Sequence, residues 1–181
     1  MTKGFIHVID DAGGEYVALR SLLRSGGIES STAVSTRDQN INYDIDINKI
    51  DDIDQITKNY DLYIMVGGFK TFYYVVNKKA PNRRLDAPVD FERVNQIVTS
   101  FVKAGATIVA PLATPGYLAR IGLLKGYQAT VYPVTELIKA LREGGAIFKN
   151  EIIVKDKSII TIKDIRKLEY KLFIQNLREI S

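Results

Sequence analysis

Three carboxylates in one short segment are the side chains of this sequence best placed to do chemistry. Asp10, Asp11 and Glu15 follow the apolar run 5–9, which is typical of a buried strand. Carboxylates in such a position can take part in acid–base catalysis or bind a divalent cation. Acids that follow a strand more commonly cap a helix or lie in solvent, so we predict no metal site and no cofactor.

The other residue types that carry catalysis are scarce. The chain has no cysteine, which excludes disulfides, zinc–cysteine sites, iron–sulfur clusters and any cysteine nucleophile. Its single histidine, His7, lies inside the apolar run and is expected to be a hydrogen-bonded core residue. A metal site made of several histidines is therefore excluded as well.

Composition and charge indicate an ordinary globular protein. The 181 residues are 46% hydrophobic and 25% charged, and we expect one domain spanning residues 1–181. The net charge of +4 is spread along the chain and matches no nucleic-acid-binding motif. No apolar run approaches the roughly 18 residues that cross a membrane, and the N-terminus lacks the apolar core of a signal peptide. We therefore expect a soluble cytoplasmic protein with no nucleic-acid or membrane partner.

The elements that must position these residues alternate along the chain. Strands and helices in alternation are typical of an α/β protein with a flavodoxin-like, mainly parallel sheet between two layers of helices. The expected strands are 5–9, 32–35, 41–47, 62–66, 107–110, 129–132, 152–154 and 159–162, of which the last two form a small antiparallel hairpin. Residues 69–89 show no clear periodicity. Because ligands bind at the carboxyl ends of the strands in such sheets, the loops 10–15, 67–71 and 111–116 are the candidate site.

Four segments of the chain together resemble a known family. Residues 60–68 are a Tyr-Asp pair, an apolar strand and two glycines, and residues 105–115 are a strand followed by a proline-containing turn. Residues 122–133 contain the sequence GLLKG and then ATVYP, and residues 150–161 resemble a closing hairpin. In order and spacing these segments are similar to the ThiJ/PfpI superfamily. The resemblance covers about residues 4–178 and implies a class I glutamine amidotransferase-like fold.

The resemblance places the family's catalytic cysteine at a position that is aliphatic in this chain. The family nucleophile lies ten residues before the glycine that opens GLLKG, which corresponds to Leu112, with Ala113 after it. Leucine has no nucleophilic atom, so the family's thiol-dependent protease, glyoxalase and deglycase reactions are excluded. Thr114 would need a nearby base to replace the thiol. The family glutamate is retained as Glu15, and Tyr132 takes the place where some members have a histidine.

These residues leave two functions and one purely structural role open. The leading hypothesis is a divergent member of the family that binds a small molecule or a partner protein. Its candidate pocket residues are Glu15, Gly67, Gly68, Leu112, Thr114 and Tyr132. The alternative is a hydrolase or lyase that uses Glu15, with Asp10 or Asp11, and no thiol. The third possibility is a structural subunit of an oligomer, and the resemblance implies a homo-oligomer, a dimer or larger.

Two local expectations follow for the candidate pocket. The backbone N–H groups of Gly67-Gly68 are expected to form a cradle for an anion or a carbonyl. Glu15 loses hydration beside Leu112, and a buried carboxylate needs a hydrogen-bond partner. We therefore predict that Glu15 is partly buried and hydrogen-bonded to backbone N–H groups or to a new polar neighbour.

Overall fold

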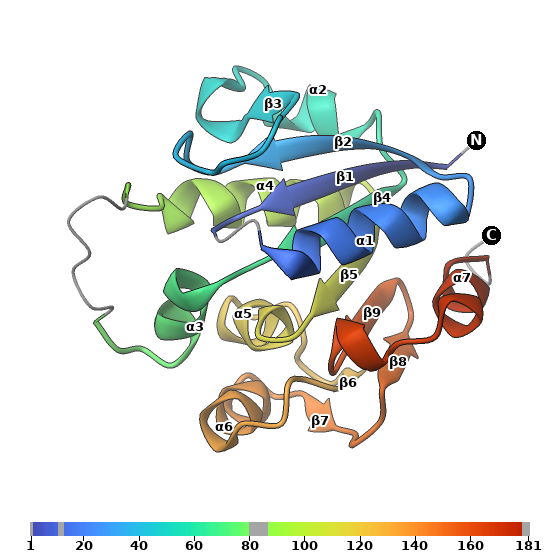
Figure 1. Cartoon of the computed structure of the whole chain (residues 1–181). Coiled ribbons are helices and arrows are strands. Elements are labelled where there is room, and N and C mark those ends of the chain that lie inside the picture. The colour runs from blue at the N-terminus through green and yellow to red at the C-terminus, as the bar shows by residue number, and fades with distance from the viewer. Residues whose placement is uncertain (1, 11–12, 80–86, 179–181) are drawn as a thin grey trace.

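The computed structural model describes residues 2–10, 13–79 and 87–178 and has a seven-stranded main sheet (Figure 1). Its strands are β1 Lys3–Val8, β2 Glu29–Val34, β3 Ile45–Asp46, β4 Leu62–Val66, β5 Thr107–Pro111, β8 Ile153–Asp156 and β9 Ile159–Ile162. They lie in the order β3-β2-β1-β4-β5-β9-β8, and β8 pairs with β9 in antiparallel while the other neighbours are parallel. A separate parallel pair joins β6 Gln128–Ala129 to β7 Ile147–Phe148. The predicted α/β fold and its antiparallel hairpin are confirmed.

Helices cover both faces of this sheet and enclose two hydrophobic cores (Figure 1). Alternate residues of a strand point to opposite faces. In β1, Ile6 therefore packs in the core shared with α1 Gly14–Ser25 and α7 Tyr170–Arg178, whereas Phe5 packs in the core under α4 Phe91–Lys103. The remaining helices are α2 Ile53–Thr57, α3 Phe69–Val75, α5 Thr114–Arg120 and α6 Thr135–Glu143, with 3-10 turns at Ile47–Lys49 and Ile165–Lys167.

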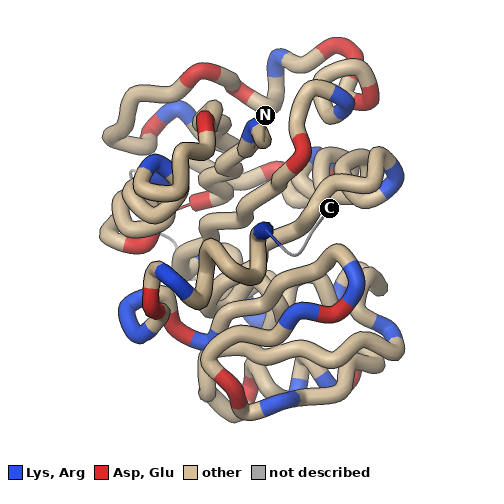
Figure 2. Tube along the Cα trace, turned by 90° about the vertical axis from the view of Figure 1, so that its right-hand side faces the viewer, with Lys and Arg blue, Asp and Glu red and all other residues tan. Residues whose placement is uncertain are grey.

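The structure corrects three of the predicted elements. Of the expected strand 129–132 only Ala129 lies in a strand, the two-residue β6. The alternating segment 41–47 forms only the two-residue strand β3, because Asp46 then caps a 3-10 turn by accepting the Asn48 N–H at 3.0 Å. Residues 69–75, which show no clear periodicity in sequence, form helix α3. Within the described ranges no helix is both long and apolar enough to span a bilayer. Charged side chains of both signs are interspersed along the trace in Figure 2.

His7 is a hydrogen-bonded residue of the core, as the sequence predicts. Its Nδ1 lies 2.6 Å from the Tyr63 hydroxyl oxygen and its Nε2 lies 2.8 Å from the Ser35 hydroxyl oxygen. The imidazole is fully buried, and desolvation lowers the pKa of His7 from 6.5 to about 3. The folded protein therefore holds this imidazole neutral at any pH where the protein is expected to function.

The buried imidazole should make the free energy of unfolding depend on pH. Between about pH 6.5 and pH 3 the unfolded chain binds a proton at His7 that the folded chain does not, so stability falls as the pH falls. This one group contributes up to about 1.4 kcal/mol per pH unit within that window. The free energy of unfolding measured in urea should therefore fall more steeply from about pH 6 to pH 4 for the wild type than for His7→Gln. Parallel stability curves for the two proteins would contradict this assignment.

Candidate functional site

The turn between β5 and α5 has a strained backbone at the residue where the family resemblance places the nucleophile. β5 ends at Pro111, α5 begins at Thr114, and Leu112 between them has a φ of +57°. Such left-handed backbone costs a residue other than glycine roughly 1–2 kcal/mol. Two hydrogen bonds of 2.9 Å hold the turn, from the Leu112 N–H to the Ile162 carbonyl and from the Tyr132 N–H to the Leu112 carbonyl. We call residues 111–114 the elbow.

The residues that flank Leu112 offer no replacement nucleophile. The Thr114 side chain is fully buried and its hydroxyl donates a hydrogen bond to the Pro111 carbonyl at 2.8 Å. The hydroxyl therefore helps to close the elbow, and its position gives a substrate no access to the oxygen. Ala113 is buried as well and has no functional group.

A buried carboxylate occupies the donors at the start of α3. Asp10 is only 3% exposed, and its Oδ1 accepts the Gly68 N–H at 2.9 Å, the Thr71 N–H at 3.3 Å and the Thr71 hydroxyl at 2.5 Å. Its Oδ2 accepts the Lys70 N–H at 2.9 Å. The expected cradle at Gly67-Gly68 must therefore be corrected, because the Gly68 N–H is bound to Asp10. An internal carboxylate thus holds the place where we expected an anion or a carbonyl.

The geometry of this cluster explains why a glycine, Gly67, directly follows β4. A Cβ atom placed on Gly67 would lie 2.7–2.8 Å from three side-chain atoms of Thr71, closer than real side chains approach. Gly67 therefore lets Thr71 pack against the strand end, where the threonine hydroxyl reaches Asp10. The two glycines thus allow Asp10 to cap α3. The sequence shows only that they follow a buried strand and does not indicate this role.

Glu15 lies in the first turn of α1 and is half-buried, as the sequence predicts. Its Oε1 atom is shielded from solvent. A carboxylate in the first turn of a helix is favoured by the helix dipole. Asp11, the third acid of the segment, lies outside the described residues. No group of three metal-binding side chains occurs in the described part of the chain, and Asp10 faces α3 through four hydrogen bonds.

Tyr132 lies beside the elbow, next to an acid–arginine pair that sequence reasoning missed. Asp164 follows β9, is buried, and accepts hydrogen bonds from the Arg166 backbone N–H, Nε and Nη2, each at 3.0 Å. The hydrogen bond from the Arg166 side chain holds the pKa of Asp164 below its usual value. The available signal was positional, since Asp164 follows a buried strand whose carboxyl end meets that of β5 at the same edge.

Comparisons with known proteins agree with this geometry. Residues 10–174 match the DJ-1/PfpI family. An uncharacterised protein of Methanocaldococcus jannaschii is 31% identical over 105 residues, which cover 58% of this chain and 45% of that protein. The match therefore spans less than half the length of this relative.

Solved structures with the same fold cover nearly the whole chain. The putative protease I of Bacteroides thetaiotaomicron has a TM-score of 0.74 at 14% identity and covers 100% of both chains. Schizosaccharomyces pombe DJ-1 has a TM-score of 0.71 at 19% identity, covering 99% of this chain and 90% of that one. At this identity the two structures establish the fold, and the sequence match over residues 10–174 establishes the family. The chain belongs to the DJ-1/PfpI family.

Proposed function

We propose that this chain is a thiol-independent member of the DJ-1/PfpI family that binds a small molecule at the elbow. The observation that carries the proposal is Leu112, an aliphatic residue held in left-handed backbone where the family resemblance places the nucleophile. The chain keeps a turn that costs roughly 1–2 kcal/mol and lacks the atom that would react there. Such a turn still presents a fixed apolar side chain at the carboxyl edge of the sheet, where α/β proteins bind ligands.

The charges at this edge indicate what kind of molecule would bind. Asp10 already satisfies the N–H groups at the start of α3, so an incoming anion would have to displace a buried carboxylate. Glu15 adds a second acidic group, and Arg166 is paired with Asp164. Together with the aliphatic Leu112, these groups favour a neutral or cationic ligand over an anionic one.

The alternative, a hydrolase or lyase that uses Glu15 with Asp10, has less support. Both oxygens of Asp10 accept hydrogen bonds from α3, which leaves this carboxylate poorly placed to exchange a proton with a substrate. Glu15 alone, with one oxygen shielded from solvent, remains the acid or base that such an enzyme would use.

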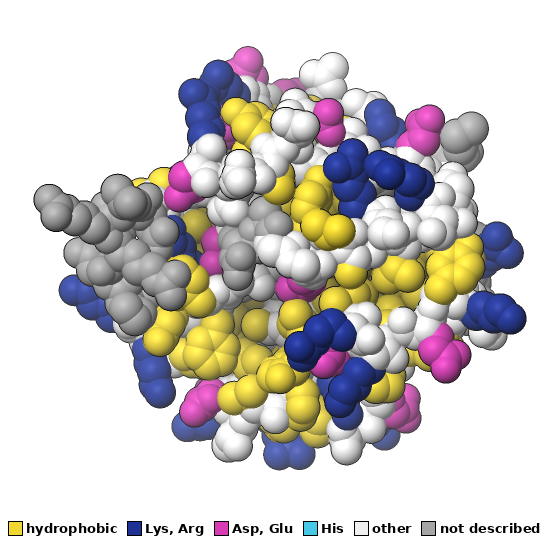
Figure 3. Space-filling view, viewed as in Figure 1, with side chains coloured by type: hydrophobic (Ala, Val, Ile, Leu, Met, Phe, Trp, Pro, Cys, Tyr) yellow, Lys and Arg dark blue, Asp and Glu magenta, His cyan; other side chains and the backbone are white. Residues whose placement is uncertain are grey.

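We also propose that residues 1–181 form one domain that assembles as a cytoplasmic homo-oligomer. Hydrophobic side chains gather over α3, α5 and α6 on the face drawn in Figure 3. Val17 on α1 is a further exposed apolar side chain, with 62% of its surface accessible. Contiguous exposed apolar patches often mark protein–protein interfaces, and the side chains over α3, α5 and α6 support the proposal on this ground.

Ligand binding at the elbow can be tested with a thermal-shift screen of small neutral and cationic compounds. Compounds that raise the melting temperature of the wild type should lose their effect in Leu112→Arg. The longer arginine side chain would fill the space at the elbow, and its charge would repel cationic compounds. The control Arg142→Gln changes an exposed residue of α6 and should leave each shift unchanged. Shifts that are equal in all three proteins, or absent throughout, would contradict the proposal.

An activity assay separates the proposal from its alternative. The wild type should not turn over methylglyoxal, with or without iodoacetamide, because the chain has no thiol. Leu112→Cys supplies the chain's only thiol, so this variant is the positive control for thiol-dependent turnover. Wild-type turnover that is abolished by Glu15→Gln would overturn the proposal and support the enzyme.

The oligomer is tested by light scattering of the purified protein at micromolar concentration. We expect a mass at least twice the 20.3 kDa of one chain. Val17→Lys should shift the distribution toward smaller species, since a buried lysine at an interface is costly. A wild-type mass near that of one chain would refute the assembly.

A further inference from the structure

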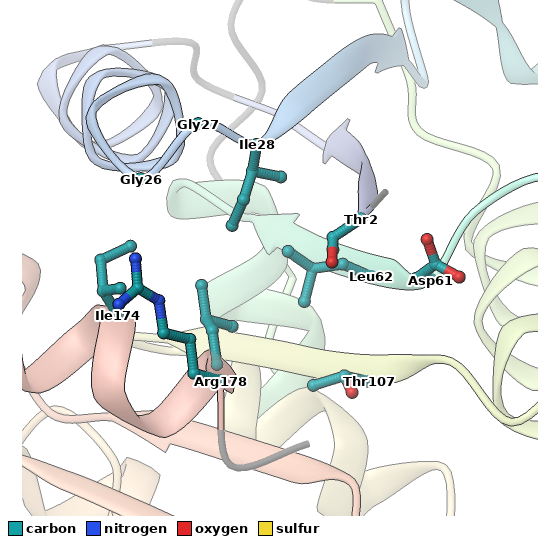
Figure 4. Close-up of a pocket in the computed structure, with 10 residues that line it drawn as sticks. Thr2, Gly26, Gly27, Ile28, Asp61, Leu62, Thr107, Ile174 and Arg178 are labelled. Atoms are coloured by element: carbon teal, nitrogen blue, oxygen red, sulfur yellow. The ribbon is translucent and has the colours of Figure 1, made fainter. Parts of the chain in front are cut away.

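A pocket lies at the edge of the sheet opposite the elbow. It has a volume of about 340 Å³ and is bounded by the amino-terminal ends of β1, β4 and β5, by the turn after α1 and by α7 (Figure 4). Figures 1 and 2 both show the start of β1 and the end of α7 close together at this edge. A volume of this size is within the range of sites that hold small organic molecules.

The pocket has an apolar floor with fixed walls. Ile28, Leu62, Ile174 and Leu177 line it, and Leu62 and Ile174 are buried. A Cβ atom on Gly26 would lie 2.4 Å from the Ile174 Cδ1, so the glycine allows α7 to approach the end of α1. The end of α1 and α7 therefore lie against each other and form one wall of the pocket.

Cationic side chains surround this floor. Arg178 lines the pocket, and its side chain runs beside Ile174 toward Gly26 in Figure 4. An adjoining hollow of about 520 Å³ shares Gly27 and Ile28 with the pocket and is lined by Lys3, Arg20 and Arg24. Ion pairs within the described ranges involve Arg37, Lys139 and Arg166, and none involves these four cations.

The acids nearby do not balance these cations. Among residues 2–10, 13–79 and 87–178, two carboxylates, Glu29 and Asp61, line the two hollows. The Asp61 Oδ2 already accepts the Lys3 backbone N–H at 3.0 Å. Figure 4 shows Asp61 and Arg178 at opposite ends of the pocket. Within the described part of the chain, four cations against two acids give these two hollows a local positive charge, strongest at the α1–α7 end, which attracts an anionic group.

We propose that this pocket binds a small organic anion with an apolar body, at a site separate from the elbow. The guanidinium of Arg178 would hold the anionic group, because a planar fork of N–H donors matches the oxygens of a carboxylate or a phosphate. Arg24 and Arg20 add attraction at the shared turn. The apolar body lies over Ile28, Leu62 and Leu177, and Asp61 at the far end repels the anionic group and so orients the ligand.

The test uses phenyl phosphate and benzoate as probes, with NMR titration of the full chain at constant ionic strength. At least one probe should give saturable shifts for residues of the pocket, and Arg178→Gln should weaken its binding about tenfold, the effect of losing a charge-assisted hydrogen bond. Arg24→Gln should weaken it to a smaller degree. The control Arg142→Gln removes the same charge on α6 and should leave the dissociation constant unchanged.

Two further comparisons test the site directly. Phenol has the apolar ring without the phosphate, and inorganic phosphate has the anionic group without the ring. Each should therefore bind more weakly than phenyl phosphate. Unchanged binding in Leu112→Arg would support a site separate from the elbow, independently of whether the elbow binds anything. Equal dissociation constants for the wild type and Arg178→Gln, no saturable binding of either probe, or equally tight binding of inorganic phosphate would overturn the proposal.

Discussion

The left-handed backbone at Leu112 is the constraint on which the candidate site depends. It lets β5 turn into α5 within two residues. The N–H and carbonyl groups of Leu112 tie the turn to Ile162 at the end of β9 and to Tyr132. Three parts of the chain thus meet at one point of the carboxyl edge. Because the tie is made by backbone groups, the turn persists although the side chain at its centre is aliphatic. The family's architecture and the family's thiol chemistry are therefore separable in this chain.

The second determinant of the site is the Asp10 carboxylate, which accepts hydrogen bonds from the protein's own backbone. Asp10 is buried, and its four hydrogen bonds satisfy donors at the start of α3 that a substrate oxygen would otherwise contact. A buried charge is tolerated only when hydrogen bonds surround it, and these donors meet that requirement. The same contacts join the segment after β1 to the segment after β4, and they occupy the N–H groups of Gly68, Lys70 and Thr71.

The α/β class, the helices on both faces of the sheet and the closing hairpin follow from apolar runs and their spacing, which are local patterns. The order of the strands in the sheet has no such local signal and comes from the structure. The segment 41–47 misled this reasoning, because its alternation suits a strand while Asp46 and Asn48 form a turn instead. The bonds of Asp10 to α3 join residues about 60 positions apart, and the Asp164–Arg166 pair draws its role from its nearness to the elbow. The bonds of Asp10 have no local signal, and for Asp164 the sequence offers only its place after a buried strand, so both contacts needed the structure.

The most direct measurement compares the stabilities of Leu112→Gly and Leu112→Ala by urea unfolding. At ordinary positions the alanine variant of a protein is more stable than the glycine variant, because glycine loses more backbone freedom on folding. In left-handed backbone the order reverses, since alanine carries the strain of its Cβ and glycine does not. We predict that Leu112→Gly is more stable than Leu112→Ala by about 1 kcal/mol. A more stable Leu112→Ala would contradict the strained elbow and the account of the site built on it.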